Sequence, residues 1–420
     1  MKTNITAVFL VLVTFFAISF ITNILGPLFP SLVTDFDISL AVTGFLPFSF
    51  FAAYGVMSIP SGMLVDKYGE KTVMIIAFVM SAIGSFLFAL MPSFAMAMGS
   101  LFFIGTGMAM LQVAINPLLR VSGGQENFAF YSVLAQLLFG GAATLSPIVY
   151  SYVVQAMAAG ESSALVSFFS KNVPADMTWL SMYWIFAAVS VLMLILIYLV
   201  KLPKVELKDD ESVGALSIYR ELLKNKTVIL FFIGIATYVG TEQGVANAIS
   251  IFLERYHGLD PVTVGASTVS DFWLMLTIGC LLGLVLVKFF DSRLVLTLFS
   301  AGAMIALTCA IFGSADLSVT AFPMVGFFLS VMWSVIFSLA LNSLADHHGS
   351  FAGILCTGIV GGGLASPLIG VIADLSGDLR VGMIVVYITL AYIFAIGFWA
   401  KPLVTNKTIK LFNQSAEQSA

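Results

Sequence analysis

The sequence predicts an all-α membrane protein with twelve spanning helices in two bundles of six. Hydrophobic residues make up 60% of the 420 residues and charged residues 10%. Soluble domains carry about 45–50% apolar and about 25% charged residues. Apolar runs long enough to cross a bilayer, about 20 residues each, occur six times on each side of one polar stretch. The bilayer is therefore the expected solvent.

The twelve runs follow one another with short links. The first begins behind Lys2, but it is longer than the apolar part of a signal peptide and no clear small-residue cleavage site follows it. We therefore expect it to span the membrane. The runs cover residues 5–33, 40–66, 71–91, 94–119, 126–158, 178–201, 225–255, 262–289, 293–313, 318–344, 350–374 and 380–402.

A polar stretch at residues 201–226 divides the chain and holds six of its eighteen Lys and Arg residues. We expect an N-terminal six-helix bundle over 1–200, a cytoplasmic bridge over 201–226 and a C-terminal six-helix bundle over 227–402. Residues 403–420 form a polar cytoplasmic tail in this division.

Positive charge supports one orientation of these helices. Fifteen of the eighteen Lys and Arg residues fall at the end that carries the bridge; Lys171, Arg255 and Arg380 fall at the other end. Because cytoplasmic loops are rich in Lys and Arg, both termini are expected in the cytoplasm. The expected location is the cell membrane, which is the inner membrane in a Gram-negative bacterium.

The two halves repeat weakly. The Ser-Pro pair at 146–147 recurs at 366–367, an offset of 220, and Asn23 aligns with Gln243 at the same offset. A shared spacing indicates a parallel repeat, and transporters built from such repeats hold their substrate between the halves near mid-membrane.

The link between the second and third runs, GMLVDKYGEK, resembles the signature of the major facilitator superfamily. In this motif Gly62 allows close helix approach and Gly69 turns the chain. Asp66 supplies a carboxylate that can hold the N-terminus of a facing helix, so these three residues are candidates for gating. Glu70 departs from the basic residue of the signature. The alternative is a polar turn whose charges only set topology.

Two longer stretches, residues 111–149 and 336–374, resemble the fucose:proton symporter family, which includes bacterial glucose/galactose transporters. The similar features are Gln112 shortly before Asn116 and its proline, an Ala-Gln pair ending at Gln136, and the segment IVGGGLASPLIGVIAD. The resemblance implies the major facilitator fold and a secondary transporter of sugars.

The residues that carry the proton in the fucose symporter are not present at the corresponding positions of this sequence. Two acids that take part in proton coupling in the fucose symporter correspond by motif to Asn23 and Gln112, and neutral amides cannot titrate. The chain is therefore expected to be a divergent relative.

Amides within apolar runs are the candidate substrate ligands, because an amide offers donors and acceptors to a hydroxyl-rich neutral solute. The alternative is that they join helices to one another. Trp273 is added as a ring that stacks on a sugar or fills the core. The amide candidates are Asn23, Gln112, Asn116, Gln136, Gln243, Asn247 and Asn342.

Glu242 is the first candidate for cation coupling, because a carboxylate inside a spanning run is costly and marks function. Asp271 is the second. Oxygens of Thr241, Gln243 and Asn247 next to Glu242 favour sodium slightly, while protonation of the carboxyl is the alternative.

Other function classes find no support in the residues. The sequence has no phosphate-binding loop, no HExxH and no GxSxG, so we expect neither an enzyme nor a cofactor. Adjacent histidines, His347 and His348, diverge and predict no metal site. The expected partners are a small solute, sodium or a proton, and the lipid bilayer, with no nucleic acid, and the chain is expected to be a monomer. An exporter of the same fold and a non-transporting sensor remain alternatives.

The orientation has a direct test. A single cysteine at Ser212, in the bridge, should react with a membrane-impermeant thiol reagent only from the cytoplasmic side. Labelling of intact cells from outside would contradict the predicted topology.

Overall fold

A computed structural model describes residues 4–123, 128–161, 163–202, 216–344 and 348–403. In this part of the chain twelve helical segments are long and apolar enough to cross a membrane, which confirms the predicted number. Their limits lie within a few residues of the predicted runs, except that the fifth begins at Leu134. The predicted tail 403–420, apart from Leu403, and most of the bridge lie outside the described residues.

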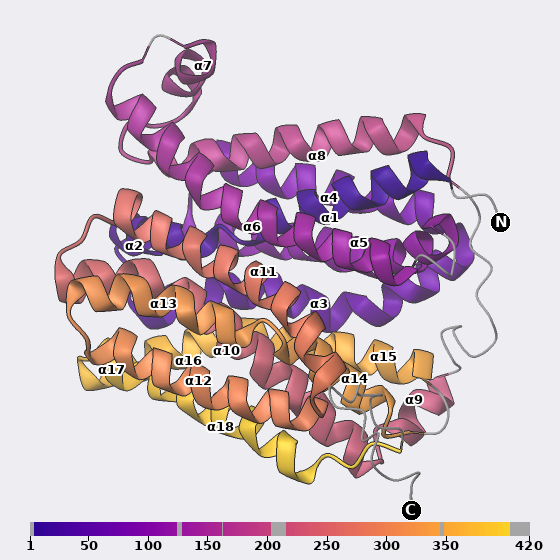
Figure 1. The fold of residues 1–420 in the computed structure, drawn as a ribbon. Helices are drawn as coiled ribbons and strands as arrows, with labels where there is room; N and C mark the ends of the chain where they lie inside the picture. The colour runs from indigo at the N-terminus through magenta and orange to yellow at the C-terminus, as the bar shows by residue number, and fades with distance from the viewer. Residues whose placement is uncertain (1–3, 124–127, 162, 203–215, 345–347, 404–420) are drawn as a thin grey trace, which may run out of the picture.

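The described part of the first half contains eight α-helices. They are α1 (Ile5–Thr22), α2 (Leu25–Phe36), α3 (Leu40–Tyr68), α4 (Glu70–Leu90), α5 (Phe94–Gly123), α6 (Phe128–Ala158), α7 (Ala164–Asn172) and α8 (Ser181–Leu199). Helix α4 packs between α5 and α8, and α6 packs on α1. Figure 1 shows these helices in indigo to magenta on one side of the molecule.

The second half follows a short connecting helix, α9 (Leu216–Leu222), within the predicted bridge. Its helices are α10 (Lys226–His257), α11 (Ala266–Phe289), α12 (Ser292–Phe312), α13 (Ala315–Leu329), α14 (Met332–Leu341), α15 (His348–Thr357), α16 (Gly361–Ser376), α17 (Leu379–Gly382) and α18 (Ile384–Trp399). They lie on the other side of Figure 1, in rose to yellow. We call the end where α8 finishes and α10 starts the bridge end, and the opposite end the far end.

Several of the described spanning segments are interrupted, among them the twelfth, which breaks at Met383 between α17 and α18. The first breaks at Asn23 and Ile24 between α1 and α2, and the tenth breaks at Ser330 and Val331 between α13 and α14. The eleventh tightens into a 3-10 turn at Gly358–Val360. Interrupted helices free backbone groups within the membrane, which is tolerated where protein or a cavity receives them.

The two halves meet most closely along α3 and α16. A Cβ built on Gly44 would lie 2.6 Å from Pro367 N, and one on Gly370 would lie 2.5 Å from Leu40 O. Ordinary side chains would not fit there, so glycine at these positions lets the backbones touch. A second contact joins α6 and α11, where Ser270 Oγ donates to Thr144 O at 2.9 Å.

A carboxylate closes this seam at the far end. Ala41 N, in the first turn of α3, donates to Asp374 Oδ2 at 2.9 Å across the two halves. The first turn of a helix has free N–H groups and a partial positive charge, so a carboxylate is favourable there. This contact has the chemistry that the sequence suggested for Asp66, but it lies at the opposite end of the molecule.

The predicted gating loop is only partly described. Gly69 ends α3 with φ +79°, as a turn glycine should, and Gly62 is buried in α3. The side chain of Asp66 lies outside the described residues. Lys71 Nζ donates to Tyr198 O at 2.9 Å and to Val200 O at 2.8 Å, so this lysine caps the C-terminus of α8.

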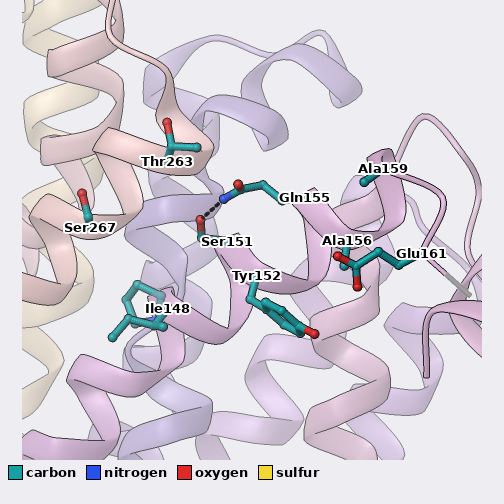
Figure 2. A pocket seen from close by; sticks show the side chains of 10 residues that line it. Ile148, Ser151, Tyr152, Gln155, Ala156, Ala159, Glu161, Thr263 and Ser267 are labelled. Carbon is teal, nitrogen blue, oxygen red and sulfur yellow. Dashed lines mark hydrogen bonds between the residues drawn. The ribbon is translucent and has the colours of Figure 1, made fainter. Parts of the chain in front are cut away.

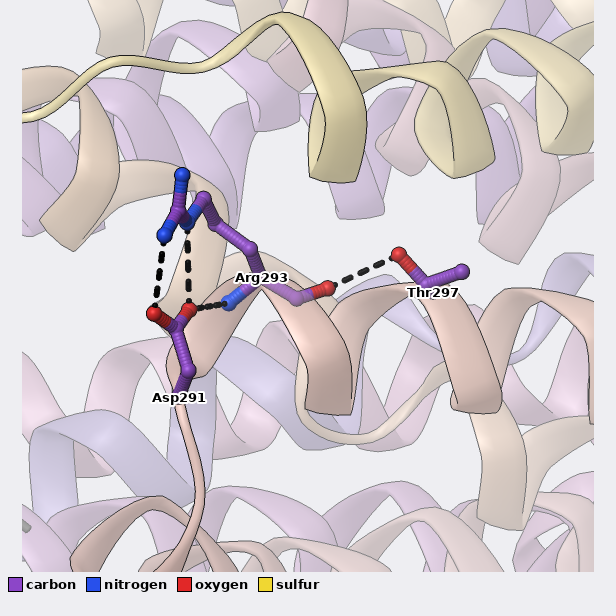
Figure 3. A network of polar contacts seen from close by, with 3 residues as sticks. All are labelled: Asp291, Arg293 and Thr297. Atoms are coloured by element: carbon purple, nitrogen blue, oxygen red, sulfur yellow. Dashed lines mark hydrogen bonds and ion pairs between the residues drawn. The ribbon is translucent and has the colours of Figure 1, made fainter.

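Asp291 starts α12 at the bridge end. Its carboxylate accepts from Arg293 N at 2.7 Å and from the Arg293 guanidinium at 3.2 and 3.0 Å (Figure 3). The hydrogen bonds from Arg293 hold the pKa of the Asp291 carboxyl below its ordinary value. At the far end a hydrogen bond from Tyr256 lowers the pKa of Asp378 in the same way.

The seam predicts the effect of a single added side chain. Gly370→Val should lower the free energy of unfolding by about 1–3 kcal/mol, because overpacking against fixed backbone strains the structure. Gly99→Val is the matched control, since nothing lies within 4 Å of a Cβ at Gly99. Thermal unfolding in detergent measures both, and equal stability of the two variants would contradict the described seam.

Candidate functional site

Asn23 stands at the break of the first span and is tied to the N-terminal half. It is 5% exposed, and its Nδ2 donates to Ser19 Oγ at 3.0 Å. Ser19 Oγ donates in turn to Phe139 O of α6 at 2.5 Å. The side-chain amide oxygen of Asn23, Oδ1, has no hydrogen-bond partner among the described residues. One acceptor at the helix break is therefore available to a ligand.

The two central helices run side by side beyond this break. A Cβ on Gly26 would lie 2.4 Å from Ala246 O and 3.5 Å from Asn247 Cα, so α2 and α10 touch. Asn23 lies about one turn before Gly26, and Gln243 lies about one turn before Asn247. The helices are parallel, so the repeat partners Asn23 and Gln243 lie at the same level of the bundle.

Glu242 belongs to a polar and aromatic group within the C-terminal half. The Tyr238 hydroxyl donates to Glu242 Oε1 at 2.8 Å, and the Tyr238 ring lies 6.1 Å from the Trp333 ring of α14. Trp333 stacks on Phe337 at 5.8 Å. Cys280 Sγ donates to Ser330 O at the break of the tenth span. The half-buried Glu242 carboxylate thus lies on α10, and α10 packs on both α13 and α14, the two parts of the interrupted tenth span.

The neighbours of Glu242 in the sequence make bonds with other helices. Thr241 Oγ1 is 2.6 Å from Thr389 Oγ1 of α18, and Asn247 Nδ2 donates to Ser366 Oγ at 3.1 Å. Gln243 is 8% exposed and packs beside Gly362 of α16. For Asn247 the helix-joining alternative is favoured, because its amide already has a partner on α16.

Trp273 holds an unpaired donor at the seam of α6 and α11. Its side chain is 3% exposed, and its indole Nε1 has no hydrogen-bond partner in the described part of the chain. Ser270 and Thr277, at i−3 and i+4 on α11, both contact α6, so Trp273 shares their face. A buried unpaired N–H is costly and gives a ligand hydroxyl something to accept.

Three more of the predicted residues lie on three different helices. Gln112 is half-buried on α5 and Gln136 is exposed on α6. Asn342 ends α14, about 15 Å along the helix from the break at 330–331, and its carbonyl oxygen accepts from Leu403 N at 2.7 Å. The structure does not bring Asn342 to the group around Glu242.

Asp271 stands apart from that group. Asp271 is exposed on the face of α11 that carries Leu274 and Ile278, whereas Cys280 lies on another face. The side chain of Asn116 lies outside the described residues.

Sequence reasoning missed Tyr238 as the partner of Glu242. The signal was present, because residues four apart lie on one face of a helix, and a tyrosine one turn before a buried carboxylate can donate to it. It also missed Ser19 and Ser366, whose partners lie on other helices and have no counterpart in local spacing.

A cavity described in the structure lies apart from these residues. A cavity of 520 Å³ opens between α6 and α11 toward the far end (Figure 2). Its polar lining includes Ser151, Gln155, Thr263 and Ser267, with a hydrogen bond of 2.7 Å from Gln155 Nε2 to Ser151 Oγ. None of the predicted site residues lines it. A second cavity, beside Asn247, measures 20 Å³. This volume holds one water molecule and is too small for a sugar.

Known proteins similar to this chain in sequence and fold are membrane transporters. The Major Facilitator Superfamily profile matches residues 11–367. A glucose/galactose transporter of Brucella abortus is 29% identical over 392 residues, covering 90% of each chain. The L-fucose-proton symporter of Escherichia coli is 23% identical over 411 residues, covering 93% of this chain and 92% of its own. The crystal structure of an E. coli fucose:proton symporter variant matches with a TM-score of 0.67 at 22% identity, over 95% of this chain and 100% of that one.

The fold is thus that of a multi-pass membrane transporter. The chain belongs to the Major Facilitator Superfamily, which confirms the predicted fold class and family. The relatives are transporters and not enzymes.

The Asn247–Ser366 contact generates a prediction. Asn247→Ala should lower the free energy of unfolding by about 1–3 kcal/mol, because a buried hydroxyl loses its partner, and should leave substrate affinity unchanged. The double variant with Ser366→Ala should cost less than the sum of the single variants. A large loss of affinity with unchanged stability would return Asn247 to the ligand set.

Proposed function

We propose that this protein moves a neutral monosaccharide across the membrane by alternating access, together with a proton. The observation that carries the proposal is the half-buried Glu242, bonded to Tyr238 beside the ring of Trp333. Aromatic faces and convergent polar groups suit a sugar, and the named relatives transport glucose, galactose and fucose.

The proposed substrate site lies between the halves at the level of Asn23. Asn23 offers its free carbonyl oxygen, and Trp333 offers a ring face. Trp273 offers its unpaired N–H, and Gln112 and Gln136 add amides from α5 and α6. Amides and indole bind hydroxyl groups without charge, which suits a neutral sugar better than an apolar drug. This difference favours sugar uptake over the exporter alternative.

Glu242 is the proposed coupling residue. A charge in a spanning helix is costly, and the hydrogen bonds from Tyr238 and Gln243 offset only part of that cost. The carboxyl can therefore take up a proton from water on one side and release it on the other. Of the oxygen ligands expected for sodium, Thr241 Oγ1 is engaged with Thr237 O and Thr389 Oγ1, whereas Asn247 bonds to Ser366 through Nδ2 and keeps its oxygen. A proton needs only the Glu242 carboxyl itself, and one named relative is an L-fucose-proton symporter, so we propose the proton.

We further propose that residues 1–200 and 227–402 rock as two bodies, with the bridge end in the cytoplasm. The α3–α16 seam and the Ala41–Asp374 bond then close the outer side. The Gly62, Asp66 and Gly69 loop is the proposed closing device on the cytoplasmic side. The far-end bond between Ala41 and Asp374 would break when the loop contact at the bridge end forms, and the reverse, as alternating access requires.

The function is tested in proteoliposomes. Wild-type protein should exchange radiolabelled glucose, galactose or fucose in counterflow, and should concentrate it when an inward proton gradient is imposed. A sodium gradient alone should have no effect. Binding without any flux would identify a sensor, and accumulation driven by sodium alone would reject proton coupling.

Glu242→Gln separates coupling from binding. The variant cannot titrate, so accumulation driven by the proton gradient should fall to the level of passive equilibration, while counterflow remains. Asp271→Asn is the matched control, since Asp271 lies on an exposed face apart from this group, and it should keep both activities. Glu242→Gln protein that still concentrates sugar would remove Glu242 from the coupling route.

A further inference from the structure

Helix α7, in the long far-end link between α6 and α8, divides its surface three ways. Ser163 Oγ caps its start by accepting from Val166 N at 3.2 Å. Val166 and Phe169 are buried against the protein, 3% and 2% exposed. The next sector carries Leu165 and Phe168, and these large apolar side chains remain 49% and 45% exposed.

The third sector of α7 is polar. At about 100° per residue, Ser167, Ser170 and Lys171 fall on the side away from Leu165 and Phe168, and all three are exposed. A short helix with one face on protein, one apolar face open and one basic polar face has the pattern of a helix at a membrane surface.

The open apolar face continues a surface that already faces lipid. The Phe168 ring lies edge-on to Trp184 at 5.5 Å, and Trp184 lies edge-on to Phe86 of α4 at 5.8 Å. Phe86 shares the exposed side of α4 with Leu90, which is 63% exposed. Apolar side chains on the outside of a spanning helix contact lipid, so Phe168 extends that contact onto α7.

The position of α7 agrees with this reading. Trp184 lies in the first turn of α8, at the far end of the span, and tryptophans gather where the bilayer meets water. Figure 1 shows α7 to the side of the first turns of α8 rather than stacked on the end of the bundle. The helix therefore lies beside the level at which α8 begins its span.

We propose that α7 is an interfacial helix that lies on the bilayer at the far end. Leu165 and Phe168 enter the boundary between headgroups and acyl chains, and Lys171 stays at the level of the phosphates. The partner is the lipid surface itself. The helix fixes the α6–α8 link to the membrane and makes the N-terminal half broader at this end.

Spin labels test the proposal on the full-length protein in proteoliposomes of phosphatidylethanolamine and phosphatidylglycerol. Single cysteines replace Leu165 or Phe168, with Ser167 and Ser170 as matched controls on the polar face, in a background where Cys280, Cys309 and Cys356 are serine. Collision rates with oxygen and with a water-soluble nickel chelate are measured. Each variant is used only if its melting temperature matches that of the cysteine-free protein.

We expect the oxygen-to-nickel ratio at positions 165 and 168 to exceed that at 167 and 170 several-fold. Equal ratios, with nickel reaching all four labels, would show an apolar face in water and overturn the proposal. Spin–spin broadening at position 168 that disappears on dilution with unlabelled protein would show a second copy covering the face, and would also overturn it. Sugar flux does not enter this readout, so its result is independent of the proposed function.

Discussion

The hydrocarbon layer supplies no water to a polar group, and the rest of this structure depends on that constraint. Backbone N–H and C=O groups must pair within the protein, so the chain crosses as helices. Where the first span breaks, the side chain of Asn23 is held by Ser19, and Ser19 by the backbone of α6. Glu242 takes a hydrogen bond from Tyr238. Polar groups left with spare capacity, such as the Asn23 carbonyl oxygen and the Trp273 N–H, are therefore the places where a polar solute gains most.

The same constraint shapes the contact between the halves. In lipid, apolar burial drives helix association only weakly, so close van der Waals contact and a few polar bonds take its place. Gly44 and Gly370 bring the backbones of α3 and α16 together, and Asp374 bonds to the free N–H of Ala41 at the far end. A seam of this kind is held by a small number of close contacts. It can open as a unit, which a fully interlocked core does not permit.

The sequence predicted the fold well because the bilayer imposes a simple rule on length and composition. The twelve apolar runs followed from that rule, and Glu242 stood out because a carboxylate is costly there. The amides could not be sorted in the same way. Asn247 and Asn342 look alike in the sequence, but one bonds to Ser366 and the other ends α14 near Leu403. Such partners depend on tertiary packing between distant segments, and local spacing does not contain them. The Asp374 contact was missed for the same reason.

The central claim is that the seam at the far end opens while the bridge end closes. Double electron–electron resonance measures this with two spin-label pairs on exposed positions of opposite halves, Met91 with Phe312 at the far end and Leu199 with Phe398 at the bridge end. The account predicts that saturating sugar or a change of pH lengthens one distance and shortens the other. In Asp374→Asn protein, which weakens the far-end bond, the far-end pair should favour its longer distance without any ligand. Distances that stay fixed under all these conditions, or that change in the same direction at both ends, would contradict it.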